Sequence, residues 1–185
     1  MGCIVDRHEC ITKCYEIPGQ MWSIELRWLY DTFLRSMLHA EIGTYCGRSL
    51  LASSGGMSKS ANIYCVDNDV DASRTSQDWV KAVREATIRL VPCNVTMLEK
   101  GSLAGALHCH ELGLKFDSIF IDACHEYAEV CADINGWIPL LKPNGIIAGH
   151  DYWAANTGVM CAVNDVLQDR FKVVPETRIW YSVQS

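Results

Sequence analysis

The sequence lacks both a long hydrophobic run and an excess of positive charge. No apolar stretch in the 185 residues approaches the roughly 18 residues that a membrane-spanning helix needs, so we expect no membrane association. Sixteen Lys and Arg side chains stand against 22 Asp and Glu, which leaves a formal net charge of −6. A general nucleic-acid binder needs a basic surface that displaces counterions. Nucleic acid is therefore not an expected partner.

The N-terminal segment also lacks the basic start and apolar core of a secretory signal peptide. Ten cysteines are scattered over expected strands and helices rather than framing loops. Reduced thiols in a cytoplasmic protein explain them best, because free cysteine packs as a small hydrophobe. Two groups stay open as metal ligands, although neither has the spacing of a zinc site: Cys10 and Cys14 with Cys3 and His8 nearby, and His108-Cys109-His110.

The length fits one domain over residues 1–185. The turn Ile17-Pro18-Gly19-Gln20 closes an N-terminal arm, residues 1–20, which we expect to be irregular. Beyond it, buried strands alternate with amphipathic helices, a pattern that requires an α/β fold with a parallel sheet covered on both faces. Two closing strands, 172–174 and 178–183, would form an antiparallel hairpin at one edge. The expected helices cover 23–37 with Ser23 as N-cap, 46–52, 71–90, 101–110, 126–141 and 158–171, and the other expected strands end near residue 42 or cover 62–67, 95–98, 116–122 and 145–151.

Residues 40–49, AEIGTYCGRS, indicate the end of a strand, a glycine turn and the first turn of a helix. Gly43 permits a positive φ and a close approach of the backbone to a ligand, and Gly47 would let the following helix pack tightly on the strand. The spacing G-x-x-x-G-x-S differs from the G-x-G-x-x-G of dinucleotide-binding proteins and from the lysine-containing P-loop. A loop of this kind behind a carboxylate suits a positively charged ligand without a pyrophosphate. A glycine turn that only joins a strand to a helix stays open as the alternative.

Four expected strands end in an acid at the same edge of the sheet: Glu41, Asp67, Asp122 and Asp151. Buried strands that end in carboxylates are costly unless these groups meet a ligand, a cation or hydrogen-bond donors. In a doubly wound sheet each of these ends faces the ligand crevice. The four acids therefore predict one shared site, although each alone is more often a solvated loop residue.

Two further runs carry a resemblance to a known family: residues 120–127, FIDACHEY, and residues 137–152, WIPLLKPNGIIAGHDY. With them, the chain resembles the class I S-adenosylmethionine (SAM)-dependent methyltransferases from the Ile17 turn to its end. It is similar to the branch of macrocin O-methyltransferase and the cephalosporin hydroxylase-like proteins, and more distantly to catechol O-methyltransferases. The resemblance implies a Rossmann-like fold whose seven-stranded, mostly parallel sheet has the order 3-2-1-4-5-7-6. It also implies SAM as cofactor and methyl transfer to a hydroxyl of a small molecule, such as a sugar or a phenol.

Carried over by position, the resemblance also implies which residues surround the cofactor. The glycine loop would hold its methionine end, Asp67 would accept hydrogen bonds from both ribose hydroxyls, and the Gly101-Ser102 turn would border the adenine. Asp122 with Ala123 would lie beside the sulfonium and the acceptor. The implied cofactor-binding residues are Glu41, Gly43, Tyr45, Gly47, Ser49, Asp67, Asn68, Gly101, Ser102, Asp122 and Ala123.

The chain departs from the family pattern at Cys124 and His150, where acids are usual. In metal-dependent members the counterparts of Asp122, His150 and Asp151 hold the ion. Such a set can still bind a divalent ion such as Mg²⁺, so a metal stays open. The alternative is a general base that takes the acceptor's proton, with Asp151 first and with His125 and His150 as histidines that titrate in the useful range. The catalytic candidates are thus Asp122, His125, His150 and Asp151.

Two other functions remain as alternatives. The departures at Cys124 and His150 leave open a module that binds SAM or another nucleoside without turnover. A nicotinamide-dependent oxidoreductase on a similar sheet is disfavoured, because the second glycine of the motif is displaced. The expected partner is a small-molecule acceptor, and a homo-oligomer stays open.

Overall fold

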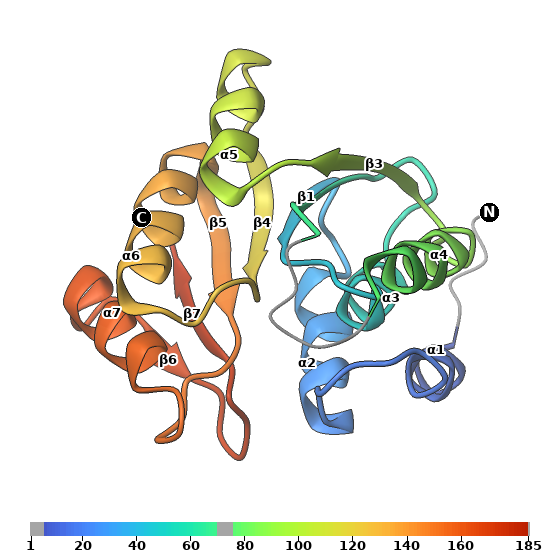
Figure 1. The fold of residues 1–185 in the computed structure, drawn as a ribbon, viewed down its shortest axis with the longest axis horizontal. Helices are drawn as coiled ribbons and strands as arrows, with labels where there is room; N and C mark the ends of the chain where they lie inside the picture. The colour runs from blue at the N-terminus through green and yellow to red at the C-terminus, as the bar shows by residue number, and fades with distance from the viewer. Residues whose placement is uncertain (1–5, 70–75, 185) are drawn as a thin grey trace.

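The computed structural model describes residues 6–69 and 76–184. These residues form a seven-stranded sheet of order β3-β2-β1-β4-β5-β7-β6, as the sequence predicted (Figure 1). All pairs are parallel except those of β7, which runs antiparallel to both β5 and β6. The strands are β1 Leu38–Ile42, β2 Asn62–Asp67, β3 Asn94–Glu99, β4 Phe116–Ile121, β5 Leu141–Gly149, β6 Lys172–Val173 and β7 Trp180–Val183.

Helices cover both faces of this sheet (Figure 1). One apolar cluster joins the sheet to α1 to α4, and a second joins it to α5, α6 and α7. The central strands are apolar on both sides, because neither face meets water: in β2, Ile63 and Cys65 pack into the first cluster and Val66 into the second. The helices are α1 Arg7–Cys14, α2 Ser23–Phe33, α3 Arg48–Ser54, α4 Gln77–Ile88, α5 Ser102–Glu111, α6 Tyr127–Trp137 and α7 Thr157–Leu167. None of the helices described is long and apolar enough to cross a membrane.

The N-terminal arm is not irregular, because it contains α1. The carboxylate of Asp6 accepts hydrogen bonds from the backbone amides of His8 and Glu9, at 2.9 and 3.2 Å, and so caps the helix. Cys10 and Cys14 lie one turn apart on its buried face. Among the described residues, neither they nor His108 and His110 belong to a group that could hold a metal, and Cys3 lies outside the described residues. The cysteines of α1 therefore serve as packing residues.

Several element boundaries differ from the predicted ones. Trp22, not Ser23, is the N-cap of α2, and the Glu25 carboxylate accepts a hydrogen bond from the Trp22 amide at 2.7 Å. The helix predicted over 126–141 ends at Trp137, where Pro139 falls in a 3₁₀ turn that leads into β5. The predicted start of the helix over 71–90 lies outside the described residues.

The buried face of α4 includes two polar side chains, whereas two large apolar residues in and after the helix face solvent. Trp79 and Leu90 are 45% and 54% exposed. Arg84 and Thr87 are buried instead. Arg84 is buried because it forms ion pairs with two carboxylates, which a count of apolar residues does not detect.

Candidate functional site

A cavity of about 880 Å³ lies at the carboxyl ends of β1, β2, β3 and β4. This edge is where ligands of open α/β sheets bind. Most of the residues predicted to bind the cofactor line it: Gly43, Tyr45, Asp67, Asn68, Gly101, Ser102, Asp122 and Ala123. His125 also lines it, whereas Glu41, Gly47 and Ser49 are not among the described lining residues. Of the four acids that end the predicted strands, Asp67 and Asp122 thus line one space, whereas Glu41 and Asp151 are not among its described lining residues.

Gly43 sits where β1 meets the end of β4. Its φ is +84°, and a Cβ built on it would lie 2.1 Å from the backbone oxygen of Asp122. Its amide donates a hydrogen bond to the Val66 oxygen at 2.9 Å, which ties the loop to β2. Only glycine fits here, so Gly43 lets β1 approach the segment that presents Asp122 to the cavity.

The sequence suggested that Gly47 lets the following helix pack on β1, but in the structure Gly47 contacts α4. Its φ is +90°, and a Cβ would lie 2.8 Å from Cγ2 of Thr87 on α4. The Thr87 hydroxyl donates a hydrogen bond to the Cys46 oxygen at 2.8 Å. Gly47 therefore lets the loop pack against α4 and acts on the cavity only through that packing.

Glu41 lies beneath the loop and is fully buried. The Ser49 hydroxyl donates to its Oε1 at 3.2 Å, while its Oε2 has no hydrogen-bond partner among the described residues. Burial raises the pKa of Glu41 well above its usual value, and the nearby charges of Asp122 and Asp67 raise it further. The protonated form is thereby favoured, so Glu41 and Ser49 support the loop from behind.

Asp67 presents a fixed carboxylate at the end of β2. Its Oδ2 accepts from the Tyr45 amide and its Oδ1 from the Asp69 amide, both at 2.8 Å. The Arg84 guanidinium lies 3.6 Å from Asp67 and 2.6 Å from Asp69. A carboxylate has about four acceptor positions, so Asp67 keeps free positions for hydroxyl groups in the cavity.

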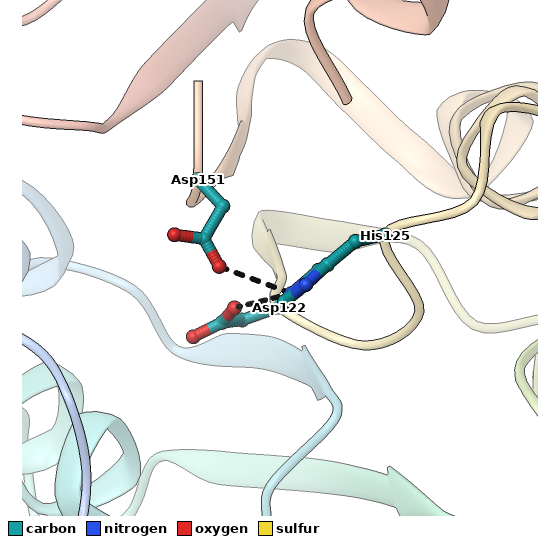
Figure 2. Close-up of side chains that lie close together, drawn as sticks. All are labelled: Asp122, His125 and Asp151. Atoms are coloured by element: carbon teal, nitrogen blue, oxygen red, sulfur yellow. Dashed lines mark ion pairs between the residues drawn. The ribbon is translucent and has the colours of Figure 1, made fainter. Parts of the chain in front are cut away.

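At the other end of the site, Asp122, His125 and Asp151 come together (Figure 2). His125 Nε2 lies 3.0 Å from Asp151 Oδ2 and 4.0 Å from Asp122 Oδ1. One ligand atom from each residue can be chosen so that all three lie within 4.8 Å of one another. Two carboxylates and one imidazole suit a divalent ion. The donor set therefore fits a metal, and it contains His125 where the sequence had favoured His150.

His150 has a different environment from the one predicted. Its side chain is 3% exposed, with Nε2 3.2 Å from Glu25 Oε1 and Nδ1 3.4 Å from Asp151 Oδ1. Burial alone would lower the pKa of His150, but Asp122, Asp151 and Glu25 together raise it to about 10. A protonated imidazole has no lone pair for a metal or a substrate proton. The geometry therefore favours neither role that the sequence suggested for His150, as a metal ligand or as a base.

Sequence reasoning missed Arg178 and Glu25, which underlie the site. Arg178 Nη1 lies 3.4 Å from Asp151 Oδ1 and Nε lies 3.4 Å from Glu25 Oε1. The guanidinium also stacks on Trp22, at 4.7 Å from the ring centroid. Glu25 and Arg178 are separated by 153 residues in the chain. No local motif could have paired them.

Burial and the charges around Asp122 and Asp151 determine which of these two acids has a raised pKa and could therefore act as a base. Burial would raise the pKa of Asp151, but His125 and His150 hold it well below its usual range. Burial raises the pKa of Asp122, although His150 opposes the shift. The sequence had favoured Asp151 as the base, whereas the structure gives the raised pKa to Asp122.

Comparison with known proteins assigns the chain to a family. A family model described as "Methyltransferase domain" matches residues 40–152. That is more than half of the chain, and it contains the glycine loop, Asp67, Asp122 and Asp151. The chain therefore belongs to this methyltransferase family. A search of curated protein sequences found no match.

Solved structures share the whole fold at low sequence identity. The O-methyltransferase TomG from Streptomyces achromogenes, in complex with SAM, matches with a TM-score of 0.71 and 11% identity over 96% of this chain and 90% of that chain. The O-methyltransferase from Bacillus cereus, in complex with S-adenosylhomocysteine (SAH), matches with a TM-score of 0.65 and 16% identity over 96% and 90%. The SAH-bound methyltransferase PaMTH1 from Podospora anserina matches with a TM-score of 0.69 and 17% identity over 100% and 88%. The fold is thus that of the class I methyltransferases.

Proposed function

We propose that this protein transfers the methyl group of SAM to a hydroxyl of a small molecule, such as a sugar or a phenol. The observation that carries the proposal is one continuous cavity with a ribose-competent carboxylate, Asp67, near one end and Asp122 and His125 at the other. The family membership supports methyl transfer, and the SAM and SAH bound in TomG and in the Bacillus cereus enzyme support the cofactor. A nicotinamide-dependent oxidoreductase has no support from these comparisons.

The charge of the cavity suits this cofactor. Its lining carries several carboxylates, among them Asp67, Asp69 and Asp122, and Lys100 is the one lysine or arginine among the described lining residues. SAM carries a positive sulfonium and a positive amino group, so an acidic lining stabilises it electrostatically. Asp67 would then accept hydrogen bonds from the ribose hydroxyls, and Asp122 would lie beside the sulfonium.

The chain's own residues would then position the reacting groups. Methyl transfer from a sulfonium is an in-line displacement, so most of the rate comes from holding the acceptor oxygen against the methyl group in a near-attack geometry. His125 and Asp151, which lie together next to Asp122, would border the acceptor oxygen. Beneath them, Arg178 and the protonated His150 hold the Asp151 carboxylate in position.

The acceptor hydroxyl must also lose its proton. Asp122, His125 and Asp151 would hold a divalent ion, which lowers the pKa of a bound hydroxyl. If no ion is used, His125 would take the proton, and Asp151, 3.0 Å from its Nε2, would stabilise the imidazolium that forms. Both routes require Asp151 to stay ionised.

Turnover is tested by measuring SAH release from SAM with a panel of hydroxyl acceptors. We expect release with at least one sugar or phenol, and loss of release in Asp151→Asn while SAM still binds. EDTA should abolish release and Mg²⁺ or Mn²⁺ should restore it if the metal route operates. Release that survives EDTA but is lost in His125→Ala would instead identify the base route. SAM binding without SAH release for any acceptor would favour a binding module.

The remaining expectations also belong to this proposal. We place the enzyme in the cytoplasm, where thiols stay reduced, and none of the nine described cysteines forms a disulfide. Its partner would be a small-molecule acceptor rather than a nucleic acid or a membrane.

A further inference from the structure

One wall of the cavity is a face of α6 and its N-cap that sequence reasoning did not identify. Glu126, Glu129 and Asp133 all line the cavity at the spacing of successive helical turns. Glu126 and Glu129 are exposed, whereas Asp133 is only 3% exposed. A cavity-lining carboxyl that is almost fully removed from bulk water must find its hydrogen-bond donors in the protein or in a ligand.

The protein supplies Asp133 with few donors. The Trp137 indole Nε1 donates a hydrogen bond to the Ser102 hydroxyl oxygen at 2.9 Å, which leaves the Ser102 proton available to Asp133, and Ser102 opposes the rise in the pKa of Asp133. No cation is paired with Asp133 in the described part of the chain, and burial raises its pKa to about 6. A carboxyl group has about four acceptor positions, so Asp133 keeps acceptor positions for a ligand.

Asp133 is linked to the β3–α5 end of the cavity, because its partner Ser102 is the first residue of α5. Lys100 and Gly101 also line this end, and a Cβ on Gly101 would meet nothing within 4 Å. On the proposed function, the sulfonium lies at Asp122 and the ribose at Asp67. Because β3 lies beyond β2 in the sheet, the purine reaches the β3–α5 end.

The purine of SAM carries a single hydrogen-bond donor, its exocyclic amino group, and its ring nitrogens are acceptors. We propose that Asp133, oriented by Ser102 and Trp137, accepts a hydrogen bond from this amino group and so selects adenine over hypoxanthine. Hypoxanthine carries an oxo group at the same position, which would face the carboxylate as a second acceptor. A site built to bond one group rejects an analogue that leaves its buried polar atoms unpaired. This inference rests on the proposed function.

The test compares the calorimetric dissociation constants of SAH and S-inosylhomocysteine, which differ in the group at C6 and in the proton that hypoxanthine carries on the neighbouring N1. Wild type should prefer SAH by at least about tenfold. In Asp133→Asn, Ser102 can still donate to the amide oxygen, which leaves the amide NH₂ to donate to the oxo group. The preference for SAH should therefore fall about tenfold or reverse. Glu129→Gln removes the same charge one turn away and should leave the preference unchanged.

Ser102→Ala provides a second variant, in case Asp133→Asn does not fold. Removing the hydroxyl that orients Asp133 should also reduce the preference, though by less. An unchanged preference in Asp133→Asn, or in Ser102→Ala if the first variant does not fold, would overturn the inference. Equal binding of both ligands by wild type would also overturn it while leaving the proposed function intact. Failure of wild type to bind SAH at all would overturn the proposed function itself.

Discussion

Arg178 and His150 are the positive charges that stabilise the carboxylates beneath the candidate site. Arg178 lies 3.4 Å from both Glu25 and Asp151, and His150 lies 3.2 Å from Glu25. Buried charges of this kind contribute little net stability as pairs, but removing one partner leaves the other charge uncompensated. The four residues therefore act as one unit that fixes Asp151 for the chemistry.

Arg178→Ala should lower the free energy of unfolding by about 3–5 kcal/mol, because Glu25 and Asp151 lose their buried cation. Arg89→Ala is the matched control, since Arg89 is 76% exposed and, within the described part of the chain, has one ion pair, with Glu85 at 3.9 Å. The control should change stability by less than about 0.5 kcal/mol. Urea unfolding of both variants measures the difference. Similar, small losses in both would show that the network does not stabilise the fold.

The raised pKa of Asp133 predicts that the stability of the fold decreases as pH rises. Its pKa rises from 3.8 to about 6 on folding, so the folded state retains its proton over that interval while the unfolded state has lost it. The contribution of this residue to stability is full below about pH 4 and is lost as pH rises through 6. Relative to Asp133→Asn, wild type should therefore lose about 2–3 kcal/mol between pH 4 and 7. A stability difference that stays constant across this range, in urea titrations at several pH values, would contradict the assignment.

At the scale of elements, the β1–α3 loop has an unusual backbone. Gly43, Tyr45 and Gly47 all have positive φ, at 84°, 46° and 90°. A left-handed conformation is costly for a residue with a Cβ, such as Tyr45, and clusters of this kind occur at functional sites. The strain is tolerated because the loop is fixed at both sides, by Asp67 at the Tyr45 amide and by Val66 at the Gly43 amide.

Gly43→Ala should destabilise the protein more than Gly113→Ala. Both glycines have positive φ, but a Cβ at Gly113 meets nothing within 4 Å, whereas one at Gly43 overlaps the backbone oxygen of Asp122. Gly113→Ala should cost only the left-handed strain of about 1–2 kcal/mol. Gly43→Ala should cost about 1–3 kcal/mol more and should weaken SAM binding, because Asp122 is displaced. Equal melting temperatures and equal affinities for the two variants would show that this packing has no role.

Features that depend on residues close together in the sequence could be predicted. The strand-end acids Asp67 and Asp122 could be identified because each follows an apolar strand, and the sheet places both at the cavity. α1 was missed because its cap, Asp6 with Glu9 three residues later, precedes few apolar residues. Which of His125 and His150 joins Asp122 and Asp151 in the candidate metal site depends on how two loops fold over the sheet edge. No periodicity carries that information.

At the scale of the whole molecule, the two apolar clusters account for most of the described cysteines, whereas Cys124 and Cys161 are exposed. Cys10, Cys14 and Cys65 are buried in the first cluster and Cys109 in the second. None of the nine described cysteines forms a disulfide. The sequence predicted this from their scattered positions, and the sheet order followed from the resemblance of the two long runs to a family. Long-range contacts such as that of Glu25 with Arg178 could not be predicted, because they depend on the finished fold.

We therefore predict that the fold needs no disulfide. Thiol titration of the denatured protein, prepared without reductant and shielded from air, should find nearly all ten cysteines free. Added reductant should leave the melting temperature unchanged, since thiols packed as small hydrophobes stabilise by burial alone. A reproducible deficit of two or more thiols, with a lower melting temperature after reduction, would contradict this.

The most direct test of the proposed function is the affinity of the protein for SAM, measured by calorimetry for wild type and Asp67→Ala. Wild type should bind SAM and not NAD. Asp67→Ala should bind SAM about 10- to 100-fold more weakly, because two hydrogen bonds to a charged acceptor are lost. Asp169→Ala, at an exposed position after α7, should bind like wild type. Equal SAM affinities for wild type and Asp67→Ala, or a wild type that binds NAD and not SAM, would contradict the proposal.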